Sequence, residues 1–173
     1  MVTPEQQAEQ LADAEEPPGS GRCAERNTPG VHFELRETGR QRSGHVRGVT
    51  EVTYDLVTSD FPAGKVFQLY IWSIEINRPL PFFKGKTADE SGKLDPVSHS
   101  IDSFMRGEWM ELSTLSTDGS VRACSRRIPF PLEARDNRCR VWLEVMNREA
   151  TIFRVYAEGF EPNEELLCRW RSD

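Results

Sequence analysis

The stretch that decides the fold is KVFQLYIWSIEI, residues 65–76. Its side chains alternate between two faces, as they do in a β-strand, which has a period of two residues. One face carries Phe67, Leu69 and Ile71, and the other carries Gln68, Tyr70 and Trp72. Turn residues, Phe61-Pro62-Ala63-Gly64, come directly before it. The length of the stretch predicts a central strand of a sheet.

The same alternation recurs on both sides of this stretch. Further strands are predicted at residues 31–35, 52–56, 81–86, 93–97, 109–115 and 120–127. Thr117-Asp118-Gly119 predicts a hairpin turn between the last two, because Asp-Gly readily adopts the positive φ values that such turns need. β-Branched and aromatic residues dominate the apolar positions, and turn residues recur at strand spacing. The sequence therefore predicts an all-β, antiparallel protein.

Residues 1–28 differ from the rest of the chain in composition. They hold six acidic residues against Arg22 and Arg26, and they contain almost nothing apolar. A segment with so little to bury is predicted to be a disordered acidic tail. It also lacks the basic start and the apolar stretch of a signal peptide, so an exported form would have its targeting segment outside this chain.

The charge distribution argues against two classes of protein. The net charge of the chain is −6, and most of it belongs to residues 1–28, so the remainder is nearly neutral. Nucleic-acid binding needs clustered Lys and Arg, and the remainder has no such stripe. No apolar run approaches the ~20 residues of a membrane-spanning helix. We therefore expect no nucleic-acid partner and no membrane-spanning segment.

An internal repeat is the most informative feature of the sequence. Phe61 and Phe160 are 99 positions apart. The same offset pairs Tyr54 with Phe153, Leu56 with Val155, Phe67 with Leu166, Leu69 with Cys168 and Ser73 with Ser172. A period near 100 residues is about the size of one immunoglobulin-type domain, although coincidence is the alternative because any two hairpins share alternation. We predict an immunoglobulin-like antiparallel β-sandwich over residues 29–132 and the first strands of a second, truncated sandwich over residues 133–173.

The connection between these two units is predicted to be an extended hinge. It is Ile128-Pro129-Phe130-Pro131-Leu132, in which two prolines hold the backbone extended. The second unit has room for only three strands, which cannot close a sandwich. Unless it docks on the first unit, it would expose one apolar face, formed by Val141, Leu143, Val145, Phe153, Val155, Leu166 and Trp170. We therefore expect the chain to be part of a longer protein.

A resemblance to a protein family rests on residues 155–166, VYAEGFEPNEEL. This stretch resembles the Gly-Phe-x-Pro-Gly-Glu segment of bacterial exported or surface proteins with tandem immunoglobulin-like domains, with Asn163 where glycine is usual. Similar proteins also show an acidic turn like residues 88–94 and a Gly-Glu pair before a late strand, here Gly107-Glu108. The resemblance implies the fold and a secreted, periplasmic or cell-surface location. It implies no catalytic activity.

The same segment can also be interpreted structurally, without reference to a family. Gly159 would let the backbone turn sharply, Phe160 would plug the end of the sandwich, and Pro162 would fix the turn. The alternative is a ligand-binding loop at the sandwich end. Tyr70 and Trp72, on one face of the central strand, are either a contact surface or inter-strand packing. The weak binding candidates are therefore Tyr70, Trp72 and Phe160.

Four cysteines, Cys23, Cys124, Cys139 and Cys168, allow three fully paired connectivities. A Cys124–Cys139 disulfide would span the junction, and a Cys139–Cys168 disulfide would tie neighbouring strands of the second unit. A free buried thiol is equally compatible with the sequence. We name Cys124, Cys139 and Cys168 as candidates for a disulfide. No zinc site is predicted, because no two cysteines or histidines are closely spaced.

No catalytic site or cofactor is predicted. The polar residues of the stretch 95–103 surround His99, but no Gly-x-Ser-x-Gly nucleophile turn accompanies them. The acidic turn Asp89-Glu90-Ser91-Gly92 lacks the ligand spacing of an EF-hand.

Three functions remain. We expect a non-catalytic binding or structural module of a bacterial envelope or secreted protein, with an unidentified protein or carbohydrate ligand. The alternative is an accessory domain of a larger carbohydrate- or peptidoglycan-active enzyme. A weaker third hypothesis is strand addition at a free sheet edge.

Overall fold

The structure is a computed structural model that describes residue 23 and residues 26–44, 49–76 and 78–161. These residues form ten strands. The strands are β1 (His32–Arg42), β2 (Thr50–Ser59), β3 (Val66–Ser73), β4 (Leu80–Thr87), β5 (Ser98–Ile101), β6 (Met110–Ser116), β7 (Arg122–Arg127), β8 (Leu132–Arg135), β9 (Arg140–Val145) and β10 (Phe153–Glu158). No helix in this part of the chain is long and apolar enough to cross a membrane.

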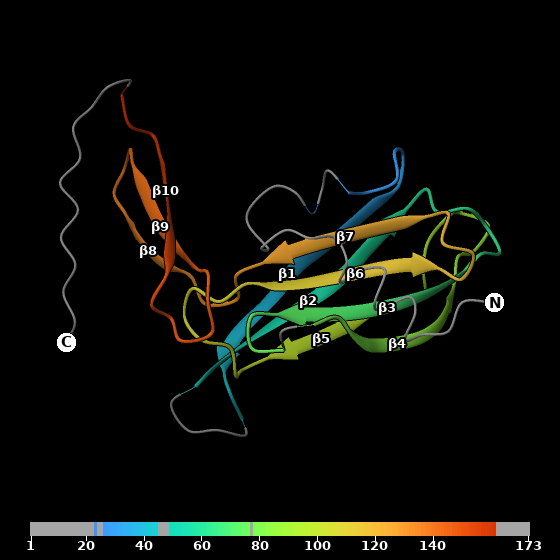
Figure 1. The fold of residues 1–173 in the computed structure, drawn as a ribbon, viewed down its shortest axis with the longest axis horizontal. Coiled ribbons are helices and arrows are strands. Elements are labelled where there is room, and N and C mark those ends of the chain that lie inside the picture. Colours follow the sequence, from blue (N-terminus) through green and yellow to red (C-terminus); the bar gives the residue numbers. More distant parts are fainter. Residues whose placement is uncertain (1–22, 24–25, 45–48, 77, 162–173) are drawn as a thin grey trace.

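The strands form three antiparallel sheets. The first seven strands make two of them, with strand orders β1-β2-β5 and β4-β3-β6-β7, which pack face to face as a sandwich (Figure 1). The third sheet has the order β10-β9-β8 and stands at one end of the sandwich (Figure 1). The prediction of an all-β, antiparallel protein is confirmed.

The core lies between the two sheets of the sandwich, where the alternating side chains of the strands meet. Phe67 and Leu69 of β3 are fully buried, on the face predicted for them. From the opposite sheet, β1 contributes Phe33 and Leu35, and β2 contributes Val52, Tyr54 and Leu56. Full burial of one such side chain contributes about 1.5–3 kcal/mol. The alternation in the sequence therefore locates the main stabilising contacts.

Two side chains of β7 close one side of the sandwich. Ser125 Oγ accepts a hydrogen bond from the Leu35 backbone N–H at 2.9 Å, and Arg127 Nε donates to the Leu35 carbonyl at 2.8 Å. Leu35 belongs to β1, an outer strand of its sheet. The backbone N–H and C=O groups of Leu35 on the outer edge of β1 are thus already bonded, so they cannot pair with a strand of another chain.

The predicted strand at residues 93–97 is wrong. Apart from one isolated bridge between Ala88 and Leu94, the stretch is irregular, and the strand β5 begins after it. Pro96 has no backbone N–H to give to a ladder, so a regular strand is not favoured here. Leu94 and Val97 are nevertheless buried in the core, which explains why the stretch has an apolar pattern.

The β6–β7 hairpin agrees with its prediction. Gly119 in the turn has φ +74°, and the Gly119 N–H donates to the Ser116 carbonyl at 2.8 Å. The side chain of Lys65 donates to Asp118 at 2.6 Å and, together with Ser116 and Ser120, lowers the pKa of that carboxyl. The turn fixes a register in which Glu111 lies opposite Arg126.

Candidate functional site

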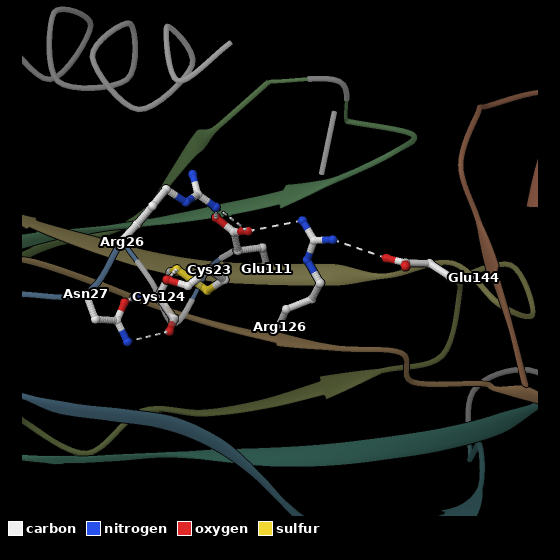
Figure 2. A network of polar contacts seen from close by, with 7 residues as sticks. All are labelled: Cys23, Arg26, Asn27, Glu111, Cys124, Arg126 and Glu144. Atoms are coloured by element: carbon white, nitrogen blue, oxygen red, sulfur yellow. Dashed lines mark hydrogen bonds and ion pairs between the residues drawn. A yellow bond between two sulfur atoms is a disulfide. The ribbon is translucent and has the colours of Figure 1, made fainter. Parts of the chain in front are cut away.

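A buried network of charged side chains lies on the outer face of the four-stranded sheet. The Glu111 carboxylate is 2% exposed, although alternation along β6 directs it away from the sandwich core. Arg26 Nη2 donates to both of its oxygens, at 3.2 and 3.0 Å. Arg126 Nη2 donates to Oε2 at 3.3 Å, so the carboxylate lies between two guanidinium groups (Figure 2). These charge-assisted bonds offset the cost of burying the carboxylate.

Arg126 also reaches the third sheet. Its Nη1 donates to Glu144 Oε1 of β9 at 3.1 Å (Figure 2). Glu144 is 2% exposed. The Arg126 guanidinium carbon lies 4.2 Å from the Trp109 ring centroid, a cation–π contact. One arginine of the sandwich thus holds buried carboxylates from two different sheets.

The network continues into β9 and β10. The Tyr156 hydroxyl donates to Glu144 Oε2 at 2.6 Å. The Tyr156 and Trp142 rings are stacked with centroids 5.1 Å apart, and the Arg140 guanidinium lies 4.6 Å from the Trp142 centroid. A cavity of about 430 Å³ lies between this face and the sandwich. Its lining consists of Arg126, Arg127, Ile128, Pro131, Arg140, Trp142, Glu144 and Tyr156.

Apolar and backbone contacts join the same two units. The Val145 N–H donates to the Gly107 carbonyl at 2.9 Å, and the buried Val145 side chain packs with Ile74 and Trp109. Gly107 has φ +81°, and a Cβ there would lie 3.2 Å from the Val145 and Leu132 side chains. The third sheet is therefore docked on the sandwich at this point, and glycine is needed where its backbone approaches.

Glu108 shows why a Gly-Glu pair precedes the late strand β6. Its carboxylate is almost fully buried and accepts the Glu75 N–H at 3.2 Å and the Met105 N–H at 3.0 Å. A carboxylate that binds backbone N–H groups fixes the loops that carry them. The pair is a structural element of the junction.

Cys23 and residues 26–28 belong to the sandwich, although the sequence assigned them to a disordered tail. Cys23 is disulfide-bonded to Cys124 of β7. Asn27 Oδ1 accepts the Cys124 N–H at 2.7 Å, and the Thr28 N–H donates to the Arg122 carbonyl at 2.8 Å. The tail prediction fails here because a disulfide and paired polar groups hold a segment that has few apolar side chains. The remaining residues of that prediction, 1–22 and 24–25, lie outside the described residues.

The cysteine predictions need a correction. Cys124 pairs with Cys23, which the sequence did not single out, so the Cys124–Cys139 alternative is excluded. Cys139 is half-buried and unpaired within the described residues, and Cys168 lies outside them. Potential ligand atoms of Cys23, Cys124 and Glu111 lie within 4.8 Å of one another, but the disulfide occupies both sulfur atoms. Thiolates are the form in which cysteine binds metals, so the oxidised protein does not offer that ligand set.

The structure buries the three binding candidates to different degrees. Tyr70 is fully buried, and burial raises its pKa to about 12. Trp72 is half-buried, with its ring edge-to-face against Trp109 at 5.5 Å. Phe160 is half-buried and follows Gly159, which has φ +80° and whose Cβ, if present, would overlap the Arg138 carbonyl. Tyr70 and Trp72 therefore serve packing, and Gly159 makes the predicted sharp turn.

The repeat of 99 residues is not reproduced in the burial of its members. Leu56 is 9% exposed, whereas its counterpart Val155 is 55% exposed. The residues before Phe61 and Phe160 do share a feature, since both Asp60 and Gly159 have positive φ. Leu166, Cys168 and Ser172 lie outside the described residues. The repeat stays a prediction.

The polar stretch 95–103 consists of the strand β5 and the residues on either side of it. The His99 ring packs edge-to-face on Phe82 at 4.7 Å, and burial lowers the pKa of the imidazole. The Ser100 hydroxyl lies 2.9 Å from Thr53 Oγ1 on β2. In the acidic turn, Asp89 Oδ1 accepts the backbone N–H groups of Lys93 and Ser91, which lowers the pKa of Asp89.

The junction network was missed by reasoning from the sequence. Part of the signal was present, because the hairpin turn at Asp118-Gly119 places Glu111 opposite Arg126 on the same face. The contact of Arg126 with Glu144 depends on how the third sheet docks, which no local pattern encodes. Neither protein-family models, nor curated proteins, nor solved structures gave a match to this chain.

Proposed function

We propose that this chain is a non-catalytic structural and binding module of a bacterial envelope or secreted protein, in which an immunoglobulin-like sandwich holds a second β-unit in a fixed orientation. The single observation that carries the proposal is the position of Arg126, which binds buried carboxylates of both units. A buried ion pair adds little net stability compared with apolar packing, but an orientation that separates the two partners is disfavoured by about 3–5 kcal/mol, because each charge would stay buried and unpaired. A spacer domain that presents another unit has to hold that unit in a fixed orientation.

The immunoglobulin-like assignment is supported by strand count and order. Constant-type immunoglobulin sandwiches have seven strands, with the first, second, fourth and fifth in one sheet and the others opposite. Here β1, β2 and β5 share a sheet, and β3, β6 and β7 share the other. The difference is β4, which pairs with β3 instead.

The Cys23–Cys124 disulfide supports the proposed location in the bacterial envelope or outside the cell. Structural disulfides persist in oxidising compartments and are rare in the cytosol. Both half-cystines are less than a tenth exposed, as expected for a structural bond. Differential alkylation followed by mass spectrometry would report the redox state of these two residues in the protein recovered from its native cells. Free thiols at both positions would contradict the assigned compartment.

The fixed orientation can be measured by ¹⁵N relaxation in the whole chain. Amides of β6 and β9 should share one rotational correlation time, because the two units tumble together. In Arg126→Met, the correlation times measured for β6 and for β9 should differ, since the contact between Arg126 and Glu144 is lost. Arg122→Met, on the same strand with an exposed side chain, is the control and should leave them equal. Independent tumbling in the unmodified protein would overturn the proposal.

A second candidate, an accessory domain of a carbohydrate- or peptidoglycan-active enzyme, is favoured by the cavity at the junction. Cavities between units that combine aromatic and polar side chains are common ligand sites. Trp142 and Tyr156 supply the rings, and Arg127 and Arg140 supply donors. Co-sedimentation with insoluble peptidoglycan should then decrease on Arg140→Ala. Arg135→Ala, on the neighbouring strand and outside the lining, is the control.

A further inference from the structure

The four-stranded sheet is buried on its outer face as well as in the core. All seven residues of β6 are buried, although every second side chain points away from the opposite sheet. In β2, of that opposite sheet, buried residues alternate with half-buried ones from Val52 onward, as expected for a strand with one solvated face. Some part of the chain therefore covers the outer face of β6.

The strand pairing places four of the buried, outward-pointing side chains next to one another. Ser113 of β6 lies between Cys124 of β7 and Tyr70 of β3. In the next row, Leu115 of β6 lies opposite Gln68 of β3. Ser113, Tyr70, Leu115 and Gln68 are each 6% exposed or less, and neither Tyr70 nor Leu115 belongs to the core between the sheets. We call these four residues the outer patch.

Two contacts fix the chain beside the outer patch, before β1 begins. Cys23 is disulfide-bonded to Cys124, directly opposite Ser113. Arg26 binds both carboxylate oxygens of Glu111, which lies two residues before Ser113 on β6. Neighbouring strands are about 4.8 Å apart, so the distance from β7 across β6 to β3 is about 10 Å, which about three extended residues can span. The residues that directly precede Cys23 are therefore within reach of the whole patch.

We propose that residues 1–22, which lie outside the described residues, dock on the outer patch and cover it. Close to Cys23 the sequence is Gly19-Ser20-Gly21, whose small side chains let a backbone approach the sheet closely. Further from Cys23, Pro17-Pro18 and Leu11 are among the apolar side chains that can pack on the aromatic and aliphatic groups of the patch. The outer face of the four-stranded sheet is thus a docking surface for the N-terminal segment of the same chain.

Attachment compensates for the polar character of this segment. A free peptide with five acidic residues and few apolar ones gains too little from burial to offset its loss of conformational entropy. The disulfide at Cys23 and the ion pair of Arg26 hold one end in place, which raises the effective concentration of the rest at the surface. A disordered tail would leave the outer patch exposed, whereas all four of its residues are buried.

Hydroxyl-radical footprinting tests the proposal, because the oxidation rate of a tyrosine ring follows its exposure to solvent. The control is Tyr54, which is buried in the core at 2% exposure. In the whole chain both tyrosines should react slowly. In a variant that lacks residues 2–22 but keeps Cys23, Tyr70 should react several-fold faster and Tyr54 should not change. Continued protection of Tyr70 in this variant would overturn the proposal, because another part of the chain would then cover the patch.

NMR spectroscopy of the whole chain decides if the shortened variant does not fold. Nuclear Overhauser effects are expected between the Tyr70 ring protons and protons of residues 1–22, and their absence would overturn the proposal. A mixture of ¹³C-labelled and unlabelled chains separates contacts within one chain from contacts between two chains. If the contacts of Tyr70 with residues 1–22 arise only between chains, a second copy supplies the cover and the proposal is equally wrong.

Discussion

The guanidinium of Arg126 lies 3.1 Å from the carboxylate of Glu144, across the junction between the sandwich and the third sheet. Both side chains are largely buried, at 14% and 3% exposure. The same guanidinium binds Glu111 on the neighbouring strand, so one cation compensates two buried anions. Among the described residues, loss of either carboxylate leaves the arginine one carboxylate and the Trp109 ring, whereas loss of the arginine affects both carboxylates.

Arg126→Met should therefore be strongly destabilising. Among the described residues, Glu111 would keep Arg26 as its only arginine, and Glu144 would keep only the Tyr156 hydroxyl. Removing one partner of a buried ion pair costs about 3–5 kcal/mol, because the other charge stays buried. Guanidinium chloride unfolding measures the change. Arg122→Met, with its exposed side chain, should change stability by no more than about 0.5 kcal/mol. A loss below about 1 kcal/mol for Arg126→Met would show that the network is not energetically important.

The strength of the junction contact itself can be isolated by a double-mutant cycle with Arg126→Met and Glu144→Gln. We expect a coupling free energy of at least about 1 kcal/mol, since directly bonded buried residues couple by 0.5–3 kcal/mol. The pair Arg140–Glu133 offers a matched comparison at 2.7 Å, with 39% and 23% exposure. Its cycle, Arg140→Met with Glu133→Gln, should give less than the buried pair, because solvent screens it. Equal couplings would contradict the argument from burial.

Gly92 should tolerate substitution less well than Gly119, although the two residues have nearly the same φ, +72° and +74°. A Cβ at Gly92 would lie 2.9 Å from the Asp60 N and Phe61 O atoms, whereas nothing lies within 4 Å at Gly119. Gly119→Ala should cost about 1–2 kcal/mol from the left-handed conformation alone. Gly92→Ala should cost about 1–3 kcal/mol more from overpacking, as measured by urea unfolding. Similar losses for both variants would show that the loop moves aside easily.

The sandwich could be predicted from the sequence because its information is local. The alternation at Phe67 and Leu69 identifies the core face, and Asp118-Gly119 fixes one hairpin. The site could not be predicted in the same way. Tyr70 looked like a candidate for an exposed contact, because alternation separates two faces of a strand without saying what covers each face. The pairing of Cys23 with Cys124 joins residues 101 positions apart and leaves no periodic trace.

Two buried tyrosines should make the protein sensitive to alkali. Burial raises the pKa of Tyr70 and Tyr54 to about 12, with the Glu37 carboxylate adding to the effect at Tyr54. The unfolded chain releases these protons near pH 10, so stability is fully present below pH 10 and is lost as pH rises toward 12. A shift of this size corresponds to about 3 kcal/mol for each tyrosine.

Tyr70→Phe tests this directly. Between pH 9 and pH 12 the unmodified protein should lose about 2 kcal/mol more stability than the variant, because the folded-state phenol is itself half ionised at pH 12. The comparison cancels the titration of Lys, Arg and Tyr54, which both proteins share. Chemical unfolding at a series of pH values gives the two curves. Parallel curves would mean that the Tyr70 phenol ionises in the folded protein as easily as in the unfolded chain, which its complete burial argues against.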